Sequence, residues 1–162
     1  MVLFNKKRAK ILVVDDDKKL VDNMVEYLTK FGYQTAAAYG GREALTSFEQ
    51  GDFQLVITDL KMPEMDGMEL LDAVKALDRR VVVMVITGYG TIESAVAALK
   101  KGAYDYIPKP FKMEELEVIV NRALERHTLF RQLGVFRGLT LALIISVPFW
   151  LILGIMLALV WK

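Results

Sequence analysis

The chain has 162 residues, which is enough for one domain of ordinary size and a short appendage but too few for two full domains. Its 21 basic and 20 acidic residues nearly balance, so the chain lacks the basic excess that electrostatic binding to nucleic acid requires, and we expect no nucleic-acid partner. It contains no cysteine, which excludes disulfides and thiolate metal sites.

After a short basic leader (residues 1–8), short apolar runs alternate with segments of helical periodicity as far as residue 126. In chain order, the pattern predicts a strand at Ala9–Val14, a helix at Lys18–Phe31, a strand at Gln34–Ala37, a helix at Arg42–Glu49, a strand at Leu55–Thr58, a helix at Met68–Leu77, a strand at Val81–Ile86, a helix at Thr91–Lys100, a strand at Tyr104–Ile107 and a helix at Met113–Arg126. Alternating strands and helices predict an α/β domain with a doubly wound, five-stranded parallel sheet covered on both faces.

Several predicted strands end in residues that carry chemistry. The first is followed by Asp15-Asp16-Asp17 and the third by Asp59, the fourth by Thr87 and the fifth, after a proline, by Lys109. In a parallel sheet these ends share one edge, where ligands bind. Clustered carboxylates require a compensating cation, and Mg²⁺ prefers such oxygen ligands. With a lysine and a hydroxyl, the site suits phosphoryl transfer.

Each residue also has a plain structural interpretation, since an aspartate after a strand is often a helix N-cap or turn residue. Their coincidence at one sheet edge favours the chemical interpretation. The segments that contain them resemble the receiver domain of bacterial two-component response regulators, and most closely the receivers at the front of enhancer-dependent transcriptional activators. The resemblance covers about residues 8–130 and lies in ILVVDDD (Ile11–Asp17), DLKMPEMDG (Asp59–Gly67), TGYG (Thr87–Gly90) and YIPKP (Tyr106–Pro110).

The resemblance implies a flavodoxin-like receiver fold in which Asp59 accepts a phosphoryl group and becomes a 4-aspartylphosphate. It implies Mg²⁺ as the cofactor, bound directly by Asp16, directly or through water by Asp15, and also by Asp59 and the backbone carbonyl of Lys61. Such a domain catalyses its own phosphorylation and dephosphorylation, with a sensor histidine kinase or a phosphotransfer protein as the donor.

The resemblance also implies that Lys109 contacts the phosphoryl group, that Thr87 and Tyr106 form a switch pair, and that the peptide bond between Lys109 and Pro110 is cis. Thr87 would move toward the phosphoryl group, and the Tyr106 ring would turn inward into the vacated space. The single histidine, His127, lies in a polar setting at the end of the last predicted helix, so we expect a separate kinase to supply the phosphoryl group.

The segment 139–161 follows a linker or helix extension (127–138) and has 23 residues without a charge. As a helix it would be about 34 Å long, enough to cross a hydrocarbon core of about 30 Å, so we expect a single transmembrane helix. Arg126, Arg131 and Arg137 precede it and only Lys162 follows it, which predicts a receiver on the cytoplasmic side of a bacterial inner membrane, in contact with membrane lipid.

Two other interpretations of this segment stay open: a buried oligomerisation helix of a soluble protein, and the front of a longer regulator cut short. Gly154 and Ala158 form a small-xxx-small pair, so a homodimer through this segment is a further alternative. The favoured function is a membrane-tethered receiver whose phosphorylation changes its contacts with a partner protein. The alternatives are a membrane-bound phosphate sink without an output partner and a scaffold that is not phosphorylated.

Overall fold

The computed structural model describes residues 9–88, 91–125, 146 and 156. The chain divides into two compact units, Met1–His127 and Thr128–Lys162. In the second unit only Ser146 and Met156 are described, and both are helical. The sheet and the helices discussed below all belong to the first unit.

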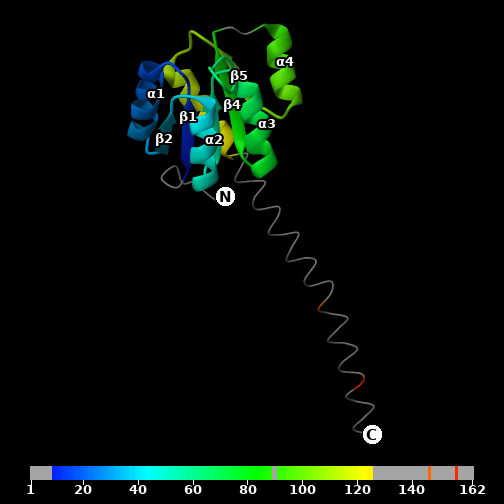
Figure 1. The fold of residues 1–162 in the computed structure, drawn as a ribbon. Helices are drawn as coiled ribbons and strands as arrows, with labels where there is room; N and C mark the ends of the chain where they lie inside the picture. The colour runs from blue at the N-terminus through cyan, green and yellow to red at the C-terminus, as the bar shows by residue number, and fades with distance from the viewer. Residues whose placement is uncertain (1–8, 89–90, 126–145, 147–155, 157–162) are drawn as a thin grey trace. The chain divides into compact units, whose positions relative to one another are not determined.

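The elements alternate as the sequence predicts, and no described boundary differs from its predicted position by more than one residue. The last helix covers residues 113–125, and its predicted end at Arg126 lies outside the described residues. The others (Figure 1) are β1 (Lys10–Val14), α1 (Lys18–Lys30), β2 (Gln34–Ala38), α2 (Gly41–Gln50), β3 (Leu55–Thr58), α3 (Gly67–Leu77), β4 (Val82–Thr87), α4 (Ile92–Lys100) and β5 (Asp105–Pro108).

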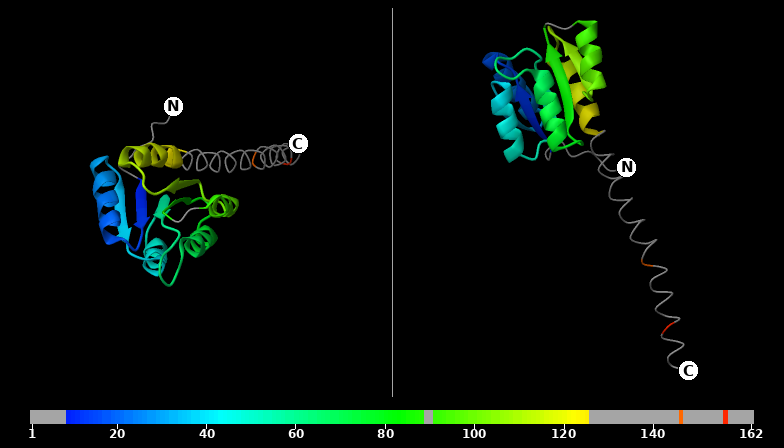
Figure 2. Two further views of the ribbon diagram at one scale, coloured as in Figure 1. Left: turned by 90° about the horizontal axis from the view of Figure 1, so that it is seen from above. Right: turned by 45° about the vertical axis from the view of Figure 1, so that its right-hand side comes forward.

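The strands form one parallel sheet in the order β2-β1-β3-β4-β5, which confirms the prediction of a flavodoxin-like, doubly wound fold. Helix α1 and the helix of residues 113–125 cover one face, and α2, α3 and α4 cover the other (Figure 2). The chain winds outward from β1 in one direction to β2 and in the other to β3. The carboxyl ends of β1 and β3 therefore flank the switch point, where a ligand binds in folds of this kind.

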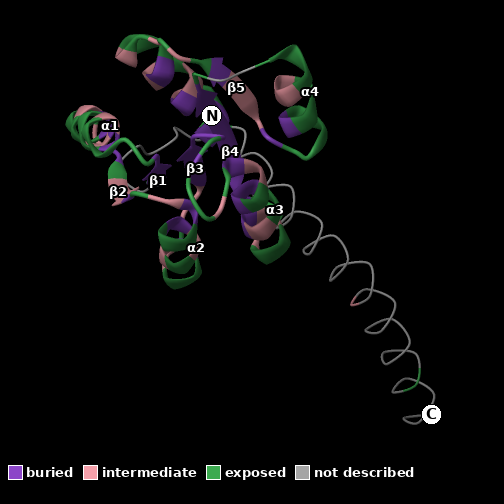
Figure 3. Cartoon of the chain, turned by 45° about the horizontal axis from the view of Figure 1, so that its top comes forward, coloured by how far each residue is buried: buried purple, intermediate pink, exposed green. Residues whose placement is uncertain are grey.

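Two hydrophobic cores lie on the two sides of the sheet. Successive strand residues point to opposite faces, so Ile11 and Val13 pack under α1 and the helix of residues 113–125, whereas Leu12 and Val14 pack under α2 and α3. Burial on both faces explains why these strands are continuous apolar runs. Figure 3 shows the central strands as buried, with exposed residues on the outer surfaces of the helices.

Within the described part of the chain, no helix is both long enough and apolar enough to span a membrane. The predicted transmembrane segment 139–161 lies outside the described residues except for Ser146 and Met156, as do the leader 1–8 and the linker 127–138. The membrane helix, the orientation and the Gly154–Ala158 contact therefore stay predictions.

Candidate functional site

Backbone hydrogen bonds continue the pairing of the sheet one residue beyond the strands and fix the backbone of three predicted site residues. The amide of Asp15 donates to Ala38 O over 3.3 Å, that of Asp59 to Val14 O over 3.0 Å, and that of Lys109 to Thr87 O over 2.9 Å. Each acceptor is the last residue of its strand. The side chains of Asp15, Asp59 and Lys109 are thus placed at one edge by the strand ladder itself.

Three carboxylates gather at this edge, as the sequence predicts. One oxygen from each of Asp15, Asp16 and Asp59 lies within 4.8 Å of the others, a spacing that suits a single metal ion. The side chains of Asp15 and Asp59 are only 3% and 7% exposed, whereas Asp16 is exposed. A cation bound here would therefore contact two buried carboxylates on its protein side. Solvent could reach it on the side of Asp16, which is exposed.

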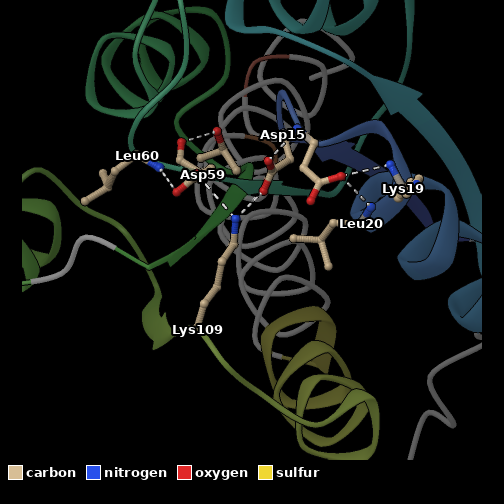
Figure 4. Close-up of polar contacts among 8 residues, drawn as sticks. Asp15, Lys19, Leu20, Asp59, Leu60 and Lys109 are labelled. Carbon is tan, nitrogen blue, oxygen red and sulfur yellow. Dashed lines mark hydrogen bonds and ion pairs between the residues drawn. The ribbon is translucent and has the colours of Figure 1, made fainter.

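Lys109 supplies a positive charge between the two buried carboxylates (Figure 4). Its Nζ lies 2.6 Å from Asp15 Oδ2 and 3.3 Å from Asp59 Oδ2. Burial raises the pKa of Asp15, and the hydrogen bond from Lys109 offsets only part of that effect. Burial alone would lower the pKa of Lys109, but its hydrogen bond to Asp15 and the charges of both carboxylates outweigh burial and raise it. The ammonium group is therefore charged at neutral pH and already neutralises part of the acidic cluster.

The carboxylate of Asp59 has a fixed orientation. Its Oδ1 accepts a hydrogen bond of 2.7 Å from the amide of Leu60, and its Oδ2 is turned toward Lys109 (Figure 4). The backbone carbonyl of Asp59 accepts a 2.9 Å bond from the Thr58 hydroxyl. A carboxylate held in this way is oriented before any substrate arrives, which lowers the entropic cost of reaction.

The N-cap interpretation of the aspartate run holds for Asp17. Its Oδ1 accepts hydrogen bonds from the amides of Lys19 and Leu20, at 3.0 and 3.3 Å, and begins α1. The amide of Asp17 in turn donates to Asp15 Oδ1 over 2.9 Å. The run is therefore divided: Asp17 caps the helix, and Asp15 and Asp16 enter the cluster.

The loop after β3 packs tightly against Asp59. The amide of Gly67 donates to Leu60 O over 2.9 Å, and a Cβ atom at Gly67 would lie only 2.0 Å from Asp59 O. Only glycine lets the start of α3 come this close to the backbone of Asp59. The sequence motif contains Gly67 but does not show this steric reason for a glycine there. Lys61 is exposed in the same loop, two residues after Asp59. The metal-binding role of its carbonyl stays a prediction.

The predicted switch residues lie on neighbouring strands. Val85 pairs with Tyr106 and Thr87 with Pro108, so Thr87 and Tyr106 share the sheet face that α4 covers. Thr87 is buried and Tyr106 is half-buried, with its Oη 3.4 Å from Ser94 Oγ in α4. The peptide bond between Lys109 and Pro110 is cis, as the resemblance implied.

Comparison with known proteins decides the family. The model of the response regulator receiver domain matches residues 11–121, most of the described part of the chain. The chain belongs to the response regulator receiver family. The chain is 41% identical over 114 residues to the transcriptional regulatory protein ZraR of Escherichia coli. This match covers 70% of the chain and 26% of ZraR. The chain is 39% identical to the nitrogen assimilation regulatory protein NtrX of Azorhizobium caulinodans, covering 80% of this chain and 29% of NtrX.

Solved structures agree with this assignment. A receiver domain protein from Clostridium thermocellum superposes with a TM-score of 0.72 at 34% identity, covering 75% of this chain and 98% of that one. NtrX from Brucella abortus superposes with a TM-score of 0.75 at 37% identity, covering 80% of this chain and 30% of NtrX. The expected relation to receivers of enhancer-dependent activators is confirmed. The receiver chain nevertheless spans only about a quarter of the length of these curated relatives.

Proposed function

We propose that Asp59 accepts a phosphoryl group from a histidine kinase or a phosphotransfer protein. The observation that carries this proposal is the setting of the Asp59 carboxylate, which is buried, oriented by the Leu60 amide, and faced by Lys109 and two further acids. The donor set of Asp15, Asp16 and Asp59 is oxygen-only and fits Mg²⁺. The backbone carbonyl of Lys61 would be a fourth ligand. When bound there, Mg²⁺ would neutralise charge on the phosphoryl oxygens.

The reaction is a displacement at phosphorus. A carboxylate oxygen of Asp59 forms the new bond to phosphorus, the bond between phosphorus and the donor's imidazole nitrogen breaks, and the electron pair stays on that nitrogen, which takes up a proton. Lys109 Nζ, already beside Asp59, pairs with a phosphoryl oxygen as charge develops. The product is an acyl phosphate. Water later attacks the phosphorus, the bond between phosphorus and the carboxylate oxygen breaks, and inorganic phosphate is released from the restored carboxylate.

Magnesium dependence tests the proposed ligand set. With a small phosphodonor, we expect the purified full chain to incorporate phosphate in Mg²⁺ and to lose at least about 10²-fold of that rate in a chelator, because the acidic cluster then repels the incoming phosphoryl oxygens. Asp16→Asn should require more Mg²⁺ for half-maximal incorporation without unfolding, since Asp16 is exposed. Incorporation that is equally fast in the chelator would contradict the metal assignment.

We further propose that phosphorylation repacks Thr87 and Tyr106 and thereby changes the surface formed by α4, β5 and the helix of residues 113–125. Their common sheet face and the half-buried position of the Tyr106 ring support this. A phosphoryl group adds charge and acceptor oxygens at Asp59, a local change that biases a two-state element. If the phosphoryl group decays quickly and no partner binds in a phosphorylation-dependent way, the phosphate-sink alternative holds instead.

The third part of the proposal is that residues 139–161 hold the receiver on the cytoplasmic side of a bacterial inner membrane. Its support is the sequence: these 23 residues carry no charge, and three arginines lie just before them. Tethering would raise the effective concentration of the receiver near a membrane-bound kinase.

Fractionation distinguishes the membrane proposal from its alternatives. After an alkaline wash of cell membranes, we expect the full chain to remain in the pellet and a chain shortened to residues 1–138 to appear in the supernatant, because only an inserted helix resists that wash. A full chain that is found in the supernatant as an oligomer would favour the buried oligomerisation helix. A shortened chain that stays in the pellet would place the membrane contact elsewhere.

A further inference from the structure

The hydroxyl of Ser94 lies at the centre of a small hydrogen-bond network at the start of α4. Its Oγ accepts a bond of 3.0 Å from the Thr91 amide and lies 2.9 Å from the Thr91 carbonyl, to which it donates. The Ser94 amide donates to Thr91 Oγ1 over 3.2 Å, which completes a capping box. The third neighbour of Ser94 Oγ is Tyr106 Oη, 3.4 Å away on β5.

The direction of the bond to Tyr106 follows from the donor count. A serine hydroxyl has one proton and two acceptor lone pairs. The proton of Ser94 is given to the Thr91 carbonyl, and one lone pair accepts the Thr91 amide. With the Ser94 proton on the Thr91 carbonyl only the second lone pair is left, so we assign Tyr106 as the donor of a contact that by itself allows either direction. All three hydrogen-bonding positions of Ser94 Oγ are then occupied. The same atom therefore bonds to the N-cap residue of α4 and to Tyr106.

Helix α4 is otherwise held weakly. Of its residues, all of which the structure describes, only Ala98 is buried, whereas α3 buries Gly67, Leu70, Leu71 and Val74. Ile92, in the first turn of α4, is 80% exposed. At the far end, Lys101 pairs with Asp72, but both side chains are about half exposed, and such an ion pair contributes little. A single side-chain bond can therefore matter for where the first turn of α4 lies.

We propose that Ser94 is a positioning residue of the switch: by accepting the hydrogen bond of Tyr106, its hydroxyl holds the tyrosine ring on the α4 side and the first turn of α4 beside β5. The inference rests on the proposed function, since it requires the Tyr106 ring to turn inward when Asp59 is phosphorylated. In this proposal, the contact between Ser94 Oγ and Tyr106 Oη belongs to the resting arrangement and is lost when the ring turns inward. It therefore stabilises the resting state of the receiver.

The expected size of the effect follows from the bond length. Removing a contact that only one of two states makes shifts the equilibrium toward the other state by the free energy of that contact. At 3.4 Å the bond is long for a hydroxyl pair, so we expect the weak end of the usual range. Ser94→Ala should raise the ratio of inward to outward tyrosine about three-fold without any phosphorylation.

The test uses the Tyr106 ring resonance of the full chain in solution NMR, identified by its absence from the spectrum of Tyr106→Phe. Wild type with and without a small phosphodonor and Mg²⁺ gives the two limiting positions. We expect the resonance of unphosphorylated Ser94→Ala to move toward the phosphorylated position, and that of Ser94→Thr, which keeps the hydroxyl, to stay at the wild-type position. Thr91→Ala is the matched control, because it removes a capping bond but leaves the Ser94 hydroxyl and its backbone partners in place.

The outcomes separate the inference from the proposed function. If phosphorylation moves the wild-type resonance but Ser94→Ala leaves it at the resting position, the role of Ser94 is refuted and the switch stands. An equal shift in Thr91→Ala would also refute it, because a frayed helix start would then suffice. If Asp59 becomes phosphorylated and the wild-type resonance does not move, the Tyr106 switch fails and the inference fails with it. Absence of any phosphorylation at Asp59 would overturn the proposed function itself.

Discussion

Asp59→Asn is expected to reduce phosphate incorporation by about 10³-fold or more, because the substitution removes the nucleophile and leaves only the surrounding charges. Asparagine has the shape of aspartate, and its amide oxygen can still accept the hydrogen bond from Leu60. The fold should therefore persist. Incorporation from a small phosphodonor in Mg²⁺, measured on the full chain beside wild type, gives the result directly.

An aspartate on the other side of β3 is the matched control. Asp52 lies just before β3, at the opposite edge of the sheet, and its side chain is exposed. Asp52→Asn changes the net charge of the protein by the same amount but should leave incorporation at the wild-type level. If both variants lost incorporation equally, the effect would come from overall charge, and if neither did, the acceptor would lie elsewhere in the chain.

Lys109→Met should have two effects, one on chemistry and one on stability. Methionine keeps an unbranched apolar stem but removes the ammonium group that lies between Asp15 and Asp59. We expect phosphate incorporation in saturating Mg²⁺ to fall about 10²-fold, the usual cost of removing one electrostatic contact to a transition state. Single-turnover incorporation at several Mg²⁺ concentrations measures this loss.

The stability effect arises because two buried carboxylates lose their counter-charge. In a chelator we expect Lys109→Met to lower the free energy of unfolding by about 2 kcal/mol, less than for a fully buried pair because the Lys109 side chain is 22% exposed and water screens it. Adding Mg²⁺ should restore most of the loss, since the ion takes over the role of the ammonium group. Denaturant unfolding with and without Mg²⁺ measures both quantities.

Lys112→Met serves as the control for this pair of effects, because Lys112 is exposed and lies three residues further along the chain. It should change neither incorporation nor the response of stability to Mg²⁺. A stability loss in Lys109→Met that Mg²⁺ does not reduce would mean that the ion and the ammonium group do not share the Asp15–Asp59 site, and the proposed ligand set would then be wrong.

The arrangement of the fold was predictable because each signal is local or follows from parallel topology. Strands buried on both faces are uniformly apolar, as in Val82–Thr87 up to its terminal threonine, and the helices follow a regular apolar spacing. Once the strands are parallel, their carboxyl ends must share an edge. The meeting of Asp15, Asp59, Thr87 and Lys109 at that edge therefore followed from their position after each strand.

What could not be predicted depends on the placement of side chains between elements far apart in the chain. Lys109 lies closer to Asp15 than to Asp59, and no sequence motif carries that difference. The bond between Ser94 and Tyr106 likewise depends on how α4 lies over β5. The position of Asp17 did carry a signal, since it directly precedes the first residue of α1, where an N-cap belongs.

The most direct test of the central claim is to locate the phosphoryl group chemically. An acyl phosphate is reduced by borohydride to an alcohol, so a phosphorylated aspartate becomes homoserine, which peptide mass spectrometry identifies. After treatment of the full chain with a small phosphodonor and Mg²⁺, we expect homoserine at position 59 and aspartate at positions 15 and 16. Homoserine at another aspartate, or incorporated phosphate that borohydride does not convert, would contradict the assignment of Asp59 as the acceptor.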